Sequence, residues 1–97
     1  MKIDILSTAE DDLVDGYLFY EDQEAGIGEY FLSTLFAEIA SLHLYAGSHK
    51  IVWGRHRMLS KTFPFGIFYT VGNDTVKVWA ILDLRRDPSY LHKRATR

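Results

Sequence analysis

The sequence predicts an α+β domain in which an N-terminal helical hairpin packs on one face of a mostly antiparallel sheet of four to five strands. Three observations predict it. Apolar residues recur at helical spacing before Gly47, short strand-like runs follow it, and 97 residues give room for one hydrophobic core. We therefore expect one domain over residues 1–97, with the element order β-α-α-β-β-β-α.

The first strand and the first helix are predicted within residues 2–22. Residues 2–5 alternate polar and apolar side chains, which is typical of a short strand. Ser7 and Glu10 then have the spacing of a capping box, in which side chains satisfy the first N–H groups of a helix. Apolar residues follow on one helical face: Ala9, Leu13, Tyr17 and Tyr20. This helix is expected to end near Asp22.

A second helix follows a short connection marked by Gly26 and Gly28. Its apolar stripe has helical spacing: Ile27, Phe31, Leu35, Ile39 and Leu42. Gly47 is expected to end it, because glycine is the preferred residue just beyond a helix C-terminus. Two antiparallel helices with a short loop between them make a helical hairpin.

Four strand-like runs come next, at residues 51–53, 58–63, 65–71 and 75–82. Residues 72–74 read as the tight turn of a hairpin. The run 78–82 is apolar on both faces, which favours a central strand. Phe68 and Trp79 are expected in the core. Phe63 and Phe65, on either side of Pro64, are expected at the surface.

The C-terminus is predicted to be a short basic helix or tail over residues 89–97. Asp87 and Pro88 suit the N-cap and the first position of such a helix. Arg85 and Arg86 follow directly on strand residues, so their side chains should point to opposite faces. We expect one of them to hold the tail through Asp83 or Asp87, and the other to face a partner.

Composition excludes several classes of protein. There is no cysteine, so disulfides and thiolate metal sites are excluded, and a reducing compartment is expected. The N-terminus has no apolar signal core, and no apolar stretch approaches the roughly 20 residues that cross a bilayer. We therefore expect a cytoplasmic protein without a membrane partner.

The charge is divided between the halves of the chain. Residues 1–49 carry one basic and ten acidic residues, a net charge of −9, whereas residues 50–97 carry ten basic and three acidic residues, a net charge of +7. Such asymmetry points to macromolecular partners. The alternative is that ordinary surface ion pairs join the two halves.

Neither a metal nor a cofactor is expected. The four histidines, His43, His49, His56 and His92, are never three or four residues apart, and no carboxylate pair beside them forms a metal motif. Gly26 and Gly28 lie between helices and not after a strand, so they do not form a phosphate-binding loop.

The region after Arg57 carries a family resemblance. In order, it contains a strand near 57–59, the strand 65–71, a Gly-Asn-Asp turn, the apolar strand 76–82 and Arg85-Arg86-Asp87-Pro88. With the preceding acidic and aromatic hairpin, this pattern resembles the RelE/ParE superfamily, the toxins of bacterial type II toxin–antitoxin (plasmid stabilisation) systems. The resemblance implies this fold, an antitoxin partner and a poison that acts on a core cellular machine. It also implies that Arg85 is the outward arginine, because Arg85 matches the family's functional position.

The resemblance implies one of two targets. RelE-like members cleave messenger RNA in the ribosome with basic and aromatic residues, whereas ParE-like members inhibit DNA gyrase by binding. Gly66 stands where RelE-like nucleases carry an arginine for the scissile phosphate, and an acidic overall balance is unusual for a protein that lies on ribosomal RNA. Both features favour the ParE-like branch.

Residues for either activity are concentrated in the basic half. Cleavage of RNA needs proton donors, proton acceptors and cations, and as a nuclease the chain would use Arg85, Tyr90 and Lys61, with Lys50 as an alternative lysine. The residues expected to bind a target or antitoxin share positive charge or an aromatic ring: Arg57, Lys61, Arg85, Arg86, Tyr90, Lys93 and Arg94. The alternative is a solvated basic tail, or one that pairs with the acidic first helix.

Two further interpretations concern apolar side chains. Exposed aromatic residues can stack on bases, and the candidates are Trp53, Phe63, Phe65, Phe68, Tyr69 and Trp79, although packing in the core also explains them. A homodimer through the hairpin is possible if Leu18, Phe19 and Leu32 lie outside the core. The function expected overall is a ParE-like toxin that inhibits DNA gyrase and is neutralised by an antitoxin. The alternatives are a ribosome-dependent messenger RNA endonuclease and a non-toxic protein-binding module.

Overall fold

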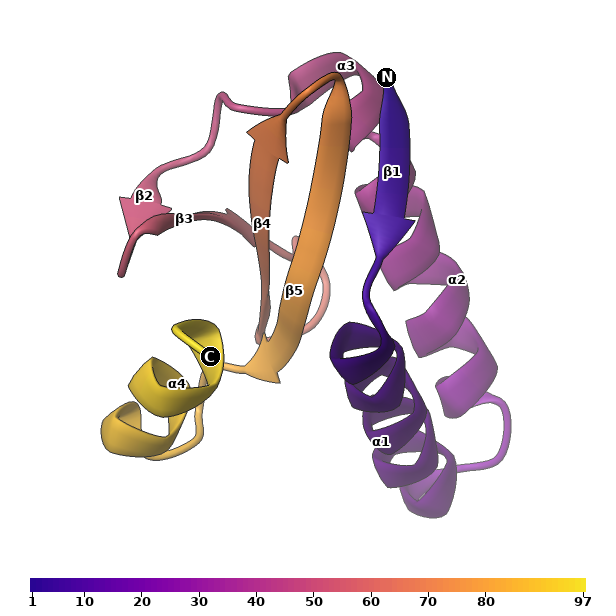
Figure 1. Cartoon of the computed structure of the whole chain (residues 1–97). Coiled ribbons are helices and arrows are strands. Elements are labelled where there is room, and N and C mark those ends of the chain that lie inside the picture. Colours follow the sequence, from indigo (N-terminus) through magenta and orange to yellow (C-terminus); the bar gives the residue numbers. More distant parts are fainter.

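Helices and strands follow one another in the computed structural model much as the sequence predicts, and all 97 residues are described (Figure 1). The strands are β1 (Lys2–Ile5), β2 (Ile51–Val52), β3 (Arg55–Leu59), β4 (Phe65–Gly72) and β5 (Thr75–Asp83). The helices are α1 (Ser7–Gln23), α2 (Ile27–Ala40), α3 (Leu42–Tyr45) and α4 (Pro88–Ala95). The predicted α+β class is confirmed. The two-residue β2 lies within the strand-like run predicted at 51–53, and the one-turn α3 is the element that was not predicted.

One sheet contains all five strands in the order β1-β5-β4-β3-β2. β1 runs parallel to β5, with Lys2 opposite Thr75, and the other neighbours are antiparallel. The turn between β4 and β5 places Asn73 and Asp74 at φ +52° and +57°, the left-handed conformation that a two-residue hairpin turn of type I′ requires. β5 is a central strand, as its apolar run predicts.

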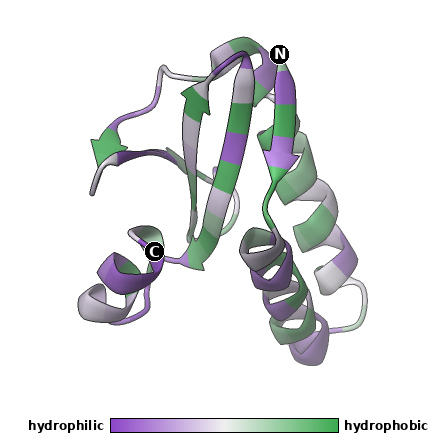
Figure 2. Ribbon diagram, viewed as in Figure 1, coloured by the Kyte–Doolittle hydropathy of each residue, from purple (hydrophilic) through white to green (hydrophobic).

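The two faces of the sheet are covered unequally (Figure 1). Alternate side chains of β4 point to opposite faces, so Ile67 and Tyr69 face the hairpin whereas Phe68 faces α4. The core beneath the hairpin contains 13 buried residues, and the core beneath α4 contains five. α4 is largely hydrophilic (Figure 2) and buries only Leu91 and Ala95. No helix is both long enough and apolar enough to cross a membrane.

A β-bulge in β5 directs its backbone toward α1. Phe68 and Tyr69 of β4 pair with Ala80 and Val78, so Trp79 has no partner in the ladder. Beyond the end of β1, the Trp79 carbonyl accepts a hydrogen bond from Thr8 Oγ1 (3.2 Å), and the Ile81 N–H donates to Asp12 Oδ2 (3.0 Å). Thr8 and Asp12 are four residues apart and therefore share one face of α1. Their side chains make the hydrogen bonds to the β5 backbone that a neighbouring strand would otherwise make.

The predicted capping box at the start of α1 is wrong. Leu6 is the N-cap residue, and no side chain caps the helix. The Leu6 N–H donates to the Val78 carbonyl (3.1 Å), so the strand pairing continues to the residue before the helix. Ser7 is therefore already helical and cannot act as the cap. Glu10 still lies in the first turn, where the helix dipole favours negative charge.

The second helix is shorter than expected, because α2 ends at Ala40 and α3 follows after Ser41. Ser41 Oγ donates to the Glu38 carbonyl, a side-chain bond that bends helices. At the other end of α2, the Glu21 carboxylate accepts hydrogen bonds from the N–H groups of Gly26 and Gly28. Gly26 has φ +95°, a conformation that glycine adopts without strain.

The strand expected at 58–63 ends early, and the aromatic residues after it are not on the surface. Ser60 Oγ accepts hydrogen bonds from the N–H groups of Thr62 and Phe63, which turns the chain out of the sheet. Phe63 is partly buried against Phe31 of α2, with ring centroids 5.1 Å apart, and Phe65 is buried. The surface prediction is wrong for both because this loop folds back under the hairpin.

α4 starts as predicted. The Asp87 side chain accepts a hydrogen bond from the Ser89 N–H (2.8 Å), and Pro88 is the first helical residue. At the other end, Arg55 of β3 donates to the carbonyls of Ala95 (2.7 Å) and Arg97 (2.9 Å). Both ends of α4 are thus held by polar contacts.

The two predicted core aromatic residues of the sheet behave differently. Phe68 is fully buried, whereas Trp79 is only half-buried. Trp79 Nε1 donates to Thr70 Oγ1 (2.9 Å), and the Arg55 guanidinium lies 4.2 Å from the centroid of the indole ring. Trp79 therefore supports the arginine that holds α4.

Candidate functional site

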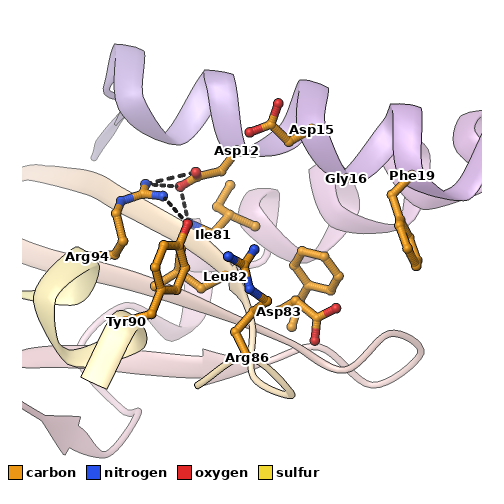
Figure 3. A pocket seen from close by; sticks show the side chains of 11 residues that line it. Asp12, Asp15, Gly16, Phe19, Ile81, Leu82, Asp83, Arg86, Tyr90 and Arg94 are labelled. Carbon is orange, nitrogen blue, oxygen red and sulfur yellow. Dashed lines mark hydrogen bonds and ion pairs between the residues drawn. The ribbon is translucent and has the colours of Figure 1, made fainter. Parts of the chain in front are cut away.

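A cleft of about 370 Å³ separates α1 from α4 at the end of β5 (Figure 3). Three of the predicted binding residues, Arg86, Tyr90 and Arg94, line it from one side. The residues on the other side and on the floor were not predicted: Asp12, Asp15, Gly16, Phe19, Phe65, Ile81, Leu82 and Asp83. The basic C-terminal segment therefore faces the acidic first helix directly.

A buried ion pair crosses this cleft. Arg94 Nη2 lies 2.8 Å from both carboxylate oxygens of Asp12, and the two side chains are only 17% and 7% exposed. Arg94 Nη1 also donates to the hydroxyl of Tyr90 (3.3 Å). Burial raises the pKa of the Asp12 carboxyl, and the hydrogen bonds from the Ile81 N–H and from Arg94 offset this only in part. Arg94, one of the predicted binding residues, is thus engaged inside the protein, where it holds α4 against α1.

Arg85 and Arg86 divide their roles in the opposite way to that expected. Arg85 makes two hydrogen bonds to the carboxylate of Asp83, Nε to Oδ1 (3.0 Å) and Nη2 to Oδ2 (2.7 Å), and these lower the pKa of Asp83. Arg86 is exposed, makes no ion pair, and lies over the Tyr90 ring at 4.1 Å from its centroid. Arg85 is 59% exposed but paired with Asp83, so Arg86 is the arginine whose charge has no partner inside the protein.

Lys93 lies in an adjoining hollow between the same helices. This hollow of about 440 Å³ also contains Arg97, Thr8 and Asp11. Neither Lys93 nor Arg97 makes an ion pair, since the ion pairs of the chain are Arg94–Asp12, Arg85–Asp83 and the one between the N-terminus and Asp74. Arg94 is thus the one residue of the basic tail that forms an ion pair with the first helix.

A second cationic region lies at the outer edge of β3. Arg57 and Lys61, both predicted binding residues, line a cavity of about 670 Å³ together with Lys50 and His49. Arg57 Nε and Glu38 Oε1 are buried there without a hydrogen-bond partner in the protein. Such groups are uncommon in proteins, because an unpaired buried polar atom costs free energy. Arg57, Lys61 and Lys50 make no ion pair within the protein, whereas Arg94 of the cleft is paired with Asp12.

The backbone of β3 is also open at this edge. The Ser60 N–H donates inward to the Phe65 carbonyl, whereas the Arg57 N–H donates outward to the Lys50 carbonyl. Because the direction alternates along an antiparallel strand, the Leu59 N–H points outward too. Leu59 pairs with Gly66 of β4 on its inner side, but β2 pairs only with Arg55 and His56, so no strand lies on the outer side of Leu59. Its side chain is 54% exposed. An open strand edge is a template for another chain.

The three residues predicted for a nuclease are not brought together. Tyr90 lines the cleft, Lys61 lines the β3 edge, and Arg85 lines neither. A Cβ atom at Gly66 would lie 3.1 Å from Leu84 Cδ2 and 3.3 Å from Arg57 Cγ. The position where RelE-like nucleases carry an arginine is thus a buried glycine covered by a leucine.

The interpretation of the aromatic residues as a platform for bases does not hold. Phe65, Phe68 and Tyr69 are buried, and of the six only Trp53 is exposed, at 41%. The Tyr69 hydroxyl accepts a hydrogen bond from the Gly47 N–H (3.0 Å) and is hydrogen-bonded to His49 Nδ1. No group of three or more histidines and carboxylates is arranged to hold a metal ion.

Comparison with known proteins finds a similar fold in a solved structure but no match in sequence. No family model matches the chain, and no curated protein matches it in sequence. A solved chain of the "Chromosomal ParDE TA system from P. aeruginosa" matches it with a TM-score of 0.71 and 18% sequence identity, over 84% of this chain and 92% of that chain. The RelE/ParE resemblance inferred from the sequence is confirmed at the level of the fold, which is ParE-like.

Proposed function

We propose that this chain is the toxin subunit of a type II toxin–antitoxin pair, that it inhibits DNA gyrase in the cytoplasm by binding, and that a cognate antitoxin neutralises it. The observation that carries this proposal is the likeness to a chain of a ParDE toxin–antitoxin system over nearly the whole of both chains. The cationic regions at the cleft and at the β3 edge supply the surfaces that such a binder needs.

The open edge of β3 is the proposed docking site of the antitoxin. An extended segment of the partner would add a strand beside Leu59, and its acidic side chains would meet Lys50, Arg57 and Lys61. Main-chain hydrogen bonds supply affinity in this mode, and the charges select the partner. The exposed Arg86 and Lys93 offer positive charge for the target on the other side of the molecule.

Inhibition by binding is favoured over cleavage of RNA. A nuclease must hold a general base, a general acid and cations around one phosphate, within hydrogen-bond reach of it. Here Tyr90 and Lys61 line different cavities, and Leu84 covers Gly66. Arg85 is also engaged with Asp83. The geometry therefore lacks a common centre for the residues that the nuclease interpretation requires.

Expression in a sensitive bacterium tests the activity. We expect growth arrest with filamentation and DNA damage, and loss of supercoiling when the purified protein is added to gyrase and relaxed plasmid. Cleavage of messenger RNA with unaffected gyrase would establish the nuclease instead. Normal growth on expression of folded protein would establish a non-toxic binding module.

Co-expression with the small protein encoded beside this gene tests the antitoxin. We expect a stable complex and restored growth. Arg57→Glu with Lys61→Glu should weaken the complex at least about tenfold, because both charges at the docking edge are reversed. Lys2→Glu with Lys77→Glu is the matched control, since it changes the net charge equally on β1 and β5. Equal affinity of the two double variants would place the antitoxin elsewhere.

A further inference from the structure

The hairpin carries an apolar groove of about 420 Å³ between α1 and α2. Apolar side chains from both helices line it, among them Val14, Leu32 and Phe36, and Ile5 of β1 reaches it. Val14 and Phe36 are 55% and 47% exposed, so this apolar surface is open to solvent. Leu32 packs against the core beneath the groove. Exposed apolar surface gathered in a groove indicates a place where another molecule docks.

The two helices that form this groove carry an excess of negative charge. Residues 7–40 contain nine Asp and Glu and no Lys, Arg or His, and of the nine only Asp12 makes an ion pair. Glu10 of α1 and Glu29 of α2 line the groove itself. Eight carboxylates without a counter-charge repel one another and attract cations. A partner that supplies positive charge here would relieve this repulsion.

We propose that this groove, the hairpin groove, binds a cationic amphipathic helix of a partner protein. Apolar side chains at helical spacing would enter between α1 and α2, and Lys or Arg beside them would meet Glu10 and Glu29. The charge required is opposite to that of the acidic segment proposed for the β3 edge. The hairpin groove is therefore a second interaction surface, and its argument does not depend on the proposed toxin activity.

A second copy of this chain does not suit the groove. Two hairpins docked face to face would bring like charges together, which costs free energy. The basic helix α4 of another copy has no free apolar face, because its Leu91 and Ala95 are buried against its own sheet. The occupant must bring both the apolar face and the positive charge.

Binding of designed peptides tests the proposal on the full-length protein. The probe is a fluorescein-labelled helical peptide of leucine and lysine with leucines at i, i+3, i+4 and i+7, and the control has glutamate in place of every lysine. Fluorescence anisotropy should show binding of the lysine peptide and none of the glutamate peptide. Absence of binding by the lysine peptide would overturn the proposal.

Surface variants locate the binding. Val14→Asp and Phe36→Asp should each abolish it, whereas Leu44→Asp, at a side chain that is 81% exposed on α3, should leave it unchanged. Glu10→Lys with Glu29→Lys should weaken it about tenfold or more, because two attractions become repulsions. Asp22→Lys with Glu24→Lys makes the same change of charge away from the groove and should weaken it less than about threefold. Circular dichroism confirms that each variant is folded.

Two results would contradict the groove as the site. Equal weakening by the two charge reversals would show general attraction to an acidic protein. A dimer in sedimentation that Val14→Asp dissociates would make a second copy the occupant. Arg57→Glu with Lys61→Glu should leave peptide binding intact, so failure of the antitoxin proposal and failure of this one are distinguishable.

Discussion

The hairpin and α4 cover opposite faces of the same sheet but are attached to it by different forces. The hairpin buries large apolar side chains such as Phe31 and Leu35, in a core of 13 residues. α4 shares a core of five, and its position depends on Arg94, Arg55 and the Asp87 cap. Apolar burial is cooperative and tolerant of small shifts, whereas ion pairs and caps act singly and need correct geometry.

This difference predicts where the molecule opens first. Elements with few buried apolar contacts exchange their amide hydrogens through local opening at a small free-energy cost. α4 should therefore detach while the hairpin and sheet remain folded. Since Arg86, Tyr90 and Lys93 belong to α4 or precede it, the cleft and its cations can change arrangement without unfolding of the domain.

The largest expected effect is on the hairpin. Phe31→Ala removes a fully buried ring that contacts Tyr20, Phe63 and Phe65, and should lower the free energy of unfolding by about 3–5 kcal/mol. Phe36→Ala, on the exposed side of the same helix, should change it by less than about 0.5 kcal/mol. Urea unfolding measures both. Similar losses in the two variants would mean that the hairpin is not attached by its apolar core.

Breaking the ion pair of α4 should have the next largest effect. Arg94→Met leaves the buried Asp12 carboxylate without its cation and should cost about 2–3 kcal/mol. Adding Asp12→Asn should recover part of this loss, because the amide oxygen still accepts from the Ile81 N–H while no buried charge remains. If the double variant is less stable than Arg94→Met, the ion pair does not hold α4.

The N-terminal caps of α4 and α1 should differ in a smaller and more local effect. Asp87→Ala removes the cap of α4 and should speed amide hydrogen exchange of its first turn several-fold, as measured by NMR. Ser7→Ala should leave the exchange of α1 unchanged, because Ser7 does not cap that helix. A comparable effect at Ser7 would restore the capping box that the structure lacks.

Mild acid should produce the smallest loss of stability, and this loss should arise at His49, which contacts Tyr69 of the core beneath the hairpin. Burial and the neighbouring His56 lower the pKa of His49 below its ordinary value of 6.5. Its stabilising contribution is therefore complete above pH 6.5 and is lost as the pH falls through the folded-state pKa. The Asp87 cap is unaffected in this range, because the hydrogen bonds of Ser89 lower its pKa below 3.8.

Thermal unfolding at pH 7 and pH 5.5 measures this difference. The midpoint of thermal unfolding should fall at the lower pH. The amide hydrogen of Gly47 should also exchange faster, because this N–H donates to the Tyr69 hydroxyl, and that hydroxyl is hydrogen-bonded to His49. His49→Asn keeps an acceptor for that hydroxyl without a titrating ring and should remove the dependence on His49. An unchanged pH dependence in this variant would assign it to another group.

The sequence predicts what local patterns determine. Helical stripes, the hairpin turn predicted at 72–74 and the Asp87 cap depend on neighbouring residues, and the structure contains all three. The capping box failed because Leu6 remains paired with Val78, a contact between distant parts of the chain. The role of Arg94 could not be predicted for the same reason, since Asp12 lies at the opposite end of the sequence and no local signal marks the pair.

The sequence indicated which types of residue line the candidate sites, but not how these residues are arranged. The seven predicted residues lie at the cleft, at the β3 edge and, for Arg85, beside Asp83. Charge alone does not reveal which cations are engaged inside the protein, so Arg94 and Arg86 could not be distinguished. Pairing of the basic tail with the acidic first helix was one of the alternatives, but the sequence did not indicate which carboxylate would pair.

The parallel pairing of β1 with β5 has a consequence for synthesis on the ribosome. Lys2 pairs with Thr75, so the first strand to leave the exit tunnel has no partner until nearly all of the chain has been made. At roughly 5–20 residues per second, this delay is about 4–15 s. During it the nascent hairpin can fold, but the sheet that covers its apolar face cannot close. A nascent chain that has not reached β5 therefore cannot complete the sheet.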